Sequence, residues 1–415
     1  MLESANRDAG DVSAGPVAVA PPAPAHAGLT ILAIALGAIA TGVAVDLVLP
    51  AIPTLPTALG STTAETQLVL ALYVAGTAVG QIAGGWLADH IDRRMLFVAS
   101  LAVFAALSLA CGLAPDIGTL SAFRFFQGIA SSGPLVVIPG MVRARFAERA
   151  VVRVMGLIGS IQSLVPALAP IAGQWLASTF GWRSSFVATA ALGALTAVFV
   201  RGWPTLLPPG RSGGPTRGTY RELFRNGAYM REALGFALVL GGLVIFVFAA
   251  PVVIVKSMGG TVTGFIVLQV VGVSTFIACA NSVSLVSNRI GTATTIAIGT
   301  GLSLLSGLGL LGYGLAGGRS PAWLIPLWIP MNIGMGLRGP TGFVAAIDAA
   351  GANDARASAL IGLFITGTIA IGTAVVASFL DYGLIAPAIA SVVIIAPAMA
   401  LAMMSLSGKQ PELPR

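Results

Sequence analysis

The chain has 415 residues, of which 56% are hydrophobic and only 9% are charged, and its formal net charge is +7. A soluble globular protein carries about 25% charged residues, so this composition excludes a water-soluble fold and indicates an integral membrane protein. The positive charge does not indicate nucleic-acid binding, because the basic residues lie between apolar runs, where they set membrane topology. With two cysteines and two histidines in the whole sequence, we expect no metal site and no cofactor.

Long apolar runs follow one another along the chain. Most have about 20–25 residues, enough for a helix to cross a hydrocarbon core of about 30 Å, and they are continuously apolar, which favours helices over a β-barrel. The sequence therefore predicts an all-α integral membrane protein with twelve transmembrane helices in two pseudo-symmetric six-helix bundles. The expected spans are 28–50, 65–88, 95–114, 117–141, 151–177, 184–203, 231–256, 262–285, 292–315, 322–346, 356–380 and 383–406.

The predicted bundles cover 28–203 and 231–406, and a linker rich in Pro, Gly and Arg joins them over 204–230. We expect 1–27 and 407–415 to be cytoplasmic tails, the first of them disordered. Basic residues favour cytoplasmic loops. With both termini in the cytoplasm, only Arg183, Lys256 and Arg319 fall in outer loops. Fourteen arginines then fall in inner loops: Arg93, Arg94, Arg143, Arg145, Arg149, Arg153, Arg201, Arg211, Arg217, Arg221, Arg225, Arg231, Arg289 and Arg356.

Two ionisable residues lie deep inside first-half spans, where a charge costs several kcal/mol. Asp46 lies near the outer end of the first span, and Arg124 lies at a similar depth in the fourth. We expect both to face one cavity and to interact directly or through water. A carboxylate that changes partners and exposure can take up and release a proton, so the pair is a candidate for proton coupling. A fixed ion pair that only sets helix packing is the alternative.

The stretch from Gln81 to Arg94, QIAGGWLADHIDRR, interrupts two apolar runs with charge. It resembles the loop between the second and third helices of the major facilitator superfamily, although His90 and Asp92 depart from the family pattern. The resemblance implies a gate in which Asp89 approaches the start of the eleventh helix and basic residues bind carboxylates or helix ends across the cytoplasmic face. The gate residues are Gly85, Asp89, Arg93 and Arg94. A purely topological role, in which the arginines only keep this loop in the cytoplasm, is the alternative.

Other motifs resemble the twelve-helix drug:proton antiporters, in the bicyclomycin and chloramphenicol branch, with phenicol exporters as the nearest group. The residues around Asp46 and Arg124 resemble the first- and fourth-helix patterns of that family, and the resemblance ties the arginine to proton coupling. Pro166, Pro170 and Gly173 resemble its fifth-helix antiporter pattern. Independently of any family, the two prolines remove helical hydrogen bonds and predict a bend, and Gly173 permits close packing. An ordinary proline kink is the alternative.

We expect a substrate cavity lined by aromatic, Met and amide side chains, which form an adaptable wall. Each candidate has plain helix packing as its alternative reading. Arg338 could bind an anionic or polar substrate, pair with Asp348, or reach the inner surface. The candidates are Tyr73, Gln162, Phe246, Gln269, Trp328, Met331, Asn332, Arg338 and Phe364.

These observations predict a monomeric secondary transporter in the inner membrane of a bacterium, with the lipid bilayer, protons and a small molecule as its partners. The expected function is proton-coupled export of small amphipathic drugs by alternating access. A transporter of a metabolite or organic anion that uses Arg338, by efflux or proton symport, is the alternative. We expect no enzyme, because the spans hold no paired carboxylates, metal cluster or Ser/Lys pair.

Overall fold

The structure is a computed structural model that describes residues 26–207 and 219–407, so most of the predicted first tail and parts of the predicted linker and second tail lie outside the described residues. All described elements are helical. The long helices of the first half are α1 (Ala27–Asp46), α3 (Thr63–His90), α4 (Arg93–Gly112), α5 (Ile117–Arg145), α6 (Glu148–Phe180) and α7 (Arg183–Gly202). Those of the second half are α9 (Gly227–Val252), α10 (Val262–Ile290), α11 (Thr292–Leu315), α12 (Leu324–Ala350), α13 (Asp354–Ala377) and α14 (Ile385–Ser407).

Short helical segments connect the long helices. The segments η1 (Leu49–Thr54) and α2 (Leu55–Leu59) follow α1, and η2 (Val253–Ser257) extends α9. The second half also contains η3 (Pro321–Trp323), η4 (Gly351–Asn353) and η5 (Leu380–Tyr382). A short helix, α8 (Tyr220–Arg225), lies within the predicted linker, and α9 begins at Gly227, a turn earlier than the expected span.

Eleven of the described helical segments are long and apolar enough to cross a membrane. They correspond to eleven of the twelve predicted spans. The tenth predicted span, 322–346, is occupied by α12, a helix of 27 residues. Asn332, Arg338 and two internal prolines interrupt the apolar sequence of α12. The chain is a multi-pass membrane protein, and we propose α12 as its twelfth span.

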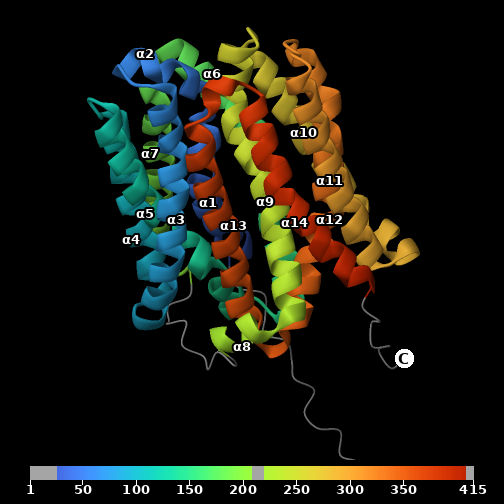
Figure 1. Cartoon of the computed structure of the whole chain (residues 1–415). Helices are drawn as coiled ribbons and strands as arrows, with labels where there is room; N and C mark the ends of the chain where they lie inside the picture. The colour runs from blue at the N-terminus through green and yellow to red at the C-terminus, as the bar shows by residue number, and fades with distance from the viewer. Residues whose placement is uncertain (1–25, 208–218, 408–415) are drawn as a thin grey trace, which may run out of the picture.

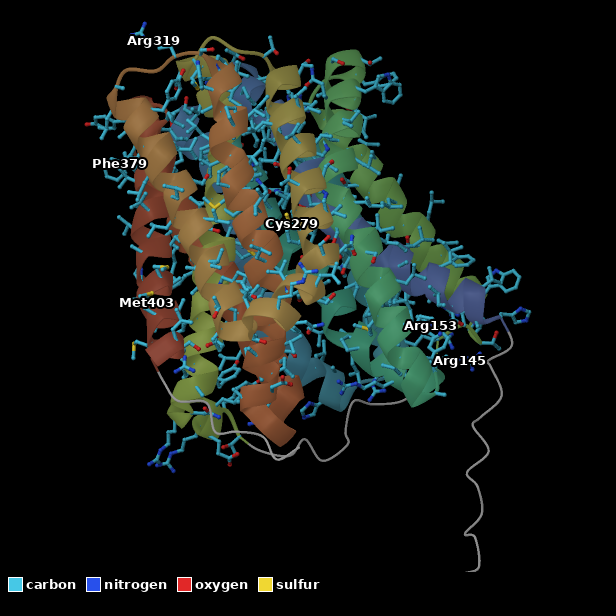
Figure 2. All side chains as sticks on the ribbon, turned by 90° about the vertical axis from the view of Figure 1, so that its right-hand side faces the viewer. Arg145, Arg153, Cys279, Arg319, Phe379 and Met403 are labelled. Atoms are coloured by element: carbon cyan, nitrogen blue, oxygen red, sulfur yellow. The ribbon has the colours of Figure 1, made fainter. Side chains whose placement is uncertain are left out.

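The two ends of the molecule carry different parts of the chain (Figures 1 and 2). We call the end at which α8 lies the linker end, and the opposite end, at which α2 lies, the distal end. Arg145 and Arg153 lie at the linker end, and Arg319 lies at the distal end (Figure 2). This separation agrees with the predicted assignment of these three arginines to opposite sides of the membrane.

The halves meet through helices that hold equivalent places in the two bundles. The second long helix of the first half, α3, packs against the fifth of the second half, α13 (Figure 1). The fifth long helix of the first half, α6, packs in turn against the second of the second half, α10. This reciprocal pairing is what a pseudo-two-fold relation between the bundles produces.

The buried apolar residues show where the halves join. One large core contains residues of both halves, and its first-half members, such as Leu49, Leu70 and Phe186, come from the distal part of the molecule. The linker-end part of the first half has a core of its own, which contains Ile34, Phe97 and no described residue of the second half. Apolar burial therefore holds the halves together mainly toward the distal end.

Candidate functional site

Arg124 lies in the interior of the first half, on α5, with none of its side chain exposed. Its Nη1 donates hydrogen bonds to the Ala44 carbonyl on α1 at 3.2 Å and to Gln127 Oε1 at 2.8 Å. The guanidinium carbon lies 4.2 Å from the centre of the Tyr73 ring on α3, a cation–π distance. Nε and Nη2 of Arg124 are buried without a hydrogen-bond partner. Arg124 thus ties three helices together and keeps unused donors.

A hydrogen-bond network surrounds this guanidinium. Gln127 Nε2 donates to Ser108 Oγ on α4 at 2.6 Å, and the Tyr73 hydroxyl donates to the Thr41 carbonyl on α1 at 3.0 Å. Gln127 and Ser108 were not among the predicted site residues. The signal for Gln127 is its place one helical turn after Arg124, since residues three apart on a helix are neighbours.

Asp46 ends α1 and is partly exposed. Among the described residues, the structure gives its carboxylate no hydrogen bond and no ion pair, and Arg124 contacts α1 through Ala44 instead. Arg124 reaches α1 at the backbone carbonyl of Ala44, two residues before Asp46. The predicted direct contact is absent in this conformation. Tyr73 lies near enough to both charges to interact electrostatically with each.

The predicted antiporter pattern lies on α6. This helix runs without interruption from Glu148 to Phe180 and holds Pro166 and Pro170 inside it. Gly173 packs against α1, where a Cβ atom at this position would overlap the Leu47 carbonyl. The close approach of α6 to α1 therefore requires a residue without a side chain, as expected for this glycine.

The predicted gate loop is bound mainly within its own half. Arg93 Nη1 donates to the Gly140 carbonyl on α5 at 3.1 Å, and Arg94 Nη1 donates to the Pro204 carbonyl beyond the end of α7 at 3.0 Å. Asp92, which stands where the related loop has a glycine, caps α4: its Oδ1 accepts hydrogen bonds from the amides of Arg94 and Met95 at 2.9 and 3.1 Å. Gly85 lies inside α3 with free space around its Cα. The side chain of Asp89 lies outside the described residues.

Some predicted cavity residues gather in the second half. The rings of Phe246 on α9 and Trp328 on α12 are stacked with centroids 4.5 Å apart. Trp328 Nε1 and the Asn332 amide face α10 at Gly272, where a Cβ would stand 2.7 Å from the indole nitrogen and 2.9 Å from Asn332 Nδ2. Gln269 lies one turn before Gly272 and Met331 is fully buried. Gly272 was not among the predicted site residues, and it is the position that admits this cluster.

Three predicted cavity residues lie elsewhere. Tyr73 belongs to the Arg124 network, and Phe364 on α13 packs edge-on against Phe224 of α8, with ring centroids 6.4 Å apart. In the first half, Gln162 lines a cavity of about 170 Å³ between α5 and α6. The other lining residues are Leu135, Ile138, Pro139, Met155, Ile158 and Gly159, so the amide of Gln162 is the one polar side chain of an otherwise apolar wall.

Arg338 is 1% exposed and lies among the helices of the second half. Its Nε donates to the Gly235 carbonyl on α9 at 3.1 Å, and its Nη1 donates to Thr300 Oγ1 on α11 at 3.2 Å. The nearby carboxylate is Glu232 on α9, which interacts with Arg338 electrostatically. Pairing with Asp348 is not what the structure gives, because the side chain of Arg338 extends between α9 and α11. Arg338 binds helices together in this conformation.

Comparison with known proteins agrees with this architecture. The model of the Major Facilitator Superfamily matches residues 34–373. The chain belongs to the Major Facilitator Superfamily. Members of this superfamily are transporters rather than enzymes, and this chain is accordingly a membrane transporter.

Two curated multidrug resistance proteins are similar to about half of this chain. The multidrug resistance protein MdtL of Escherichia fergusonii is 26% identical over 218 residues, which cover 52% of this chain and 55% of that protein. MdtL of Vibrio parahaemolyticus is 25% identical over 218 residues, with the same shares. The chain spans about half the length of the curated relatives that it matches.

Solved structures of other transporters share the fold of this superfamily member. A peptide transporter of the POT family in complex with sulfate superposes with a TM-score of 0.73 at 14% identity, covering 91% of this chain and 94% of that one. A bacterial homologue of the human lysosomal transporter Spinster, in an inward-facing and occupied conformation, gives 0.70 at 14% identity and covers 92% and 97%. At such low identity these likenesses concern the fold alone.

Proposed function

We propose that this superfamily member exports small amphipathic drugs in exchange for protons, by alternating access, from the inner membrane of a bacterium. The linker end then faces the cytoplasm, with both termini on that side, which the distribution of basic residues supports. The likeness to the MdtL proteins, which are described as multidrug resistance proteins, supports drugs as the substrate class.

The observation that carries the proposal is the contrast between Asp46 and Arg124. The arginine is fully buried and bonded to α1 and to Gln127, whereas the carboxylate, at membrane depth, has no bonding partner among the described residues. Intramembrane ionisable groups are costly and serve ion pathways. A carboxylate free to bind a proton, two residues after the α1 carbonyl that Arg124 binds and within electrostatic reach of Tyr73, can couple protonation to a movement of α1 against α5.

The substrate would bind between the halves, against surfaces with few charges. The second half offers the stacked Phe246 and Trp328 with the amides of Asn332 and Gln269. The first half offers the apolar cavity at Gln162. Stacked rings and single amides suit a flat molecule with a few polar groups, a description that includes phenicols.

Inside-out membrane vesicles with an acid interior test the proposal. Phenicols and cationic dyes are added in turn, and proton efflux is followed by fluorescence dequenching. We expect a compound that dequenches wild type and fails in Asp46→Asn. Asp116→Asn is the matched control, because Asp116 caps α5 at the distal end and lies outside the spans; it should respond like wild type. Dequenching that persists in Asp46→Asn would place coupling elsewhere, and no response to any compound would contradict drug export.

A further inference from the structure

The seam between α3 and α13 contains polar side chains that have no partner. Gln67 on α3 is completely buried, and neither its Nε2 nor its Oε1 has a hydrogen-bond partner. Thr373 on α13 is also completely buried, and its Oγ1 has none. A buried amide or hydroxyl without a hydrogen bond is unfavourable, since it has lost its contacts with water.

Helical geometry places both residues at this seam. The contact of Gln81 with α13 is fixed by Gly362, where a Cβ would stand 3.1 Å from Gln81 Oε1. Gln67 lies fourteen residues before Gln81, about four turns, and Thr373 lies eleven residues after Gly362, about three turns. Each therefore shares the face of its helix that is in contact at Gln81 and Gly362, and the two lie within about one turn of each other in height.

Gln67 and Thr373 lie in the distal part of this seam, which is the closed end of the molecule. The core that joins the halves comes from the distal part of the first half, and Leu70, between Gln67 and Gln81 on the same face of α3, belongs to it. At the distal edge, Lys256 Nζ in η2, which extends α9, donates to Thr63 Oγ1 at the start of α3 at 3.2 Å. Gln67 and Thr373 are thus covered by contacts between halves, which must part if the molecule opens at this end.

We infer that Gln67 and Thr373 are gating residues that destabilise the distally closed state. The inference rests on alternating access, as in the proposed function. When the distal seam opens, water reaches the amide of Gln67 and the hydroxyl of Thr373 and forms hydrogen bonds with them. The free-energy cost of burying these groups without partners then disappears. The cost therefore belongs to the closed state alone, and it shifts the equilibrium toward the distally open state. An apolar seam of the same shape would hold this end shut.

The test measures how often the seam opens, and it needs no substrate. In a chain carrying Cys111→Ser and Cys279→Ser, Leu70→Cys reports opening through its rate of labelling by a membrane-impermeant maleimide from the distal side. Gln67→Leu and Thr373→Val remove the polar groups and nearly keep the shapes. We expect each to slow labelling about tenfold, which corresponds to about 1.4 kcal/mol. Ser160→Cys, on the linker-end part of α6, should label no more slowly in either variant.

The matched control is Ser185→Ala. Ser185 Oγ is also buried without a partner, but it lies on α7 within the first half, so its cost is the same in both states. It should leave both labelling rates unchanged. Faster labelling in Gln67→Leu or Thr373→Val would mean that these groups are bonded across the closed seam, and an unchanged rate would mean that they do not bias it; either overturns the inference. Failure of drug export alone would leave these rates as predicted.

Discussion

At the scale of single residues, the buried arginines and the helix caps are the informative groups. Arg124 and Arg338 occupy equivalent helices of the two halves, α5 and α12, and each donates to a carbonyl of the first long helix of its half. Asp46, two residues after the Ala44 carbonyl that Arg124 binds, has no bonding partner among the described residues, whereas Glu232 near Arg338 accepts a hydrogen bond from Ser405. The residue types alone could not distinguish these two arginines, because the difference lies in what surrounds them.

Replacing Arg124 with lysine should separate charge from geometry. Lysine keeps the positive charge but lacks the planar guanidinium. It cannot bond the Ala44 carbonyl and Gln127 together and also place a planar cation over the Tyr73 ring. We expect the dequenching response to fall at least about tenfold and the free energy of unfolding in detergent to fall by about 1–3 kcal/mol. Arg183→Lys is the control, since Arg183 also donates to a carbonyl and lies over a ring, 4.3 Å from that of Trp182, at the distal end. Equal loss of transport in both variants would contradict a special role for Arg124.

The cap of α5 should make stability depend on pH. Asp116 accepts one hydrogen bond from the Thr119 amide and another from the Thr119 hydroxyl. These two bonds, the first of them most strongly, hold the pKa of Asp116 below the ordinary value of 3.8. A lowered pKa stabilises the fold above the ordinary value, and this contribution is lost as the pH falls through the lowered pKa. We expect wild type to lose more thermal stability than Asp116→Asn between pH 7 and the acid range, because asparagine caps without titrating. Parallel curves for the two proteins would refute this.

At the scale of elements, glycines determine how closely helices approach. Gly173 places α6 against the backbone of α1, and Gly272 places Trp328 and Asn332 against α10. Neither position differs in sequence from glycines that face open space, such as Gly156 on α6. The contacts that make a glycine necessary come from another helix, so they follow from packing and not from local sequence.

Alanine at Gly173 should push α6 away from α1. The added Cβ would meet the Leu47 carbonyl, which is backbone and cannot rotate aside, so we expect a loss of about 1–3 kcal/mol in stability and impaired transport. Gly156→Ala, in the same helix with nothing within 4 Å, should be neutral or stabilising by up to about 1 kcal/mol. Thermal unfolding of both variants in detergent measures this. Similar stabilities for the two would show that the contact between α6 and α1 is looser than described.

At the scale of the whole molecule, the halves are joined by an apolar core at the distal end, while the linker-end part of the first half keeps a separate core. Ser160, in the linker-end half of α6, is exposed, and Ser163, near the middle of that helix, is partly exposed. A transporter closed at one end and accessible from the other is one state of an alternating-access cycle.

This asymmetry predicts one-sided chemical access. In the chain without native cysteines, Ser160→Cys and Ser163→Cys should react with an impermeant maleimide at least about tenfold faster from the linker side than from the distal side. Vesicles of both orientations provide the two measurements. A cysteine in place of Gly60, in the exposed turn after α2, is the control and should react from the distal side alone. Equal reaction of the α6 cysteines from both sides would contradict the closed distal end.

The amino-acid sequence by itself determined the membrane class, eleven of the spans and the family, because each depends on local composition or on motifs that lie close together in the chain. Only the tertiary structure decided that Arg124 contacts Ala44 and not Asp46, that Arg338 lies between α9 and α11, and that Gln67 and Thr373 share a seam. These facts join residues far apart in sequence. They depend on which face of each helix turns toward which neighbour, and in a chain that is apolar nearly all round its helices, hydrophobic patterning carries little of that information.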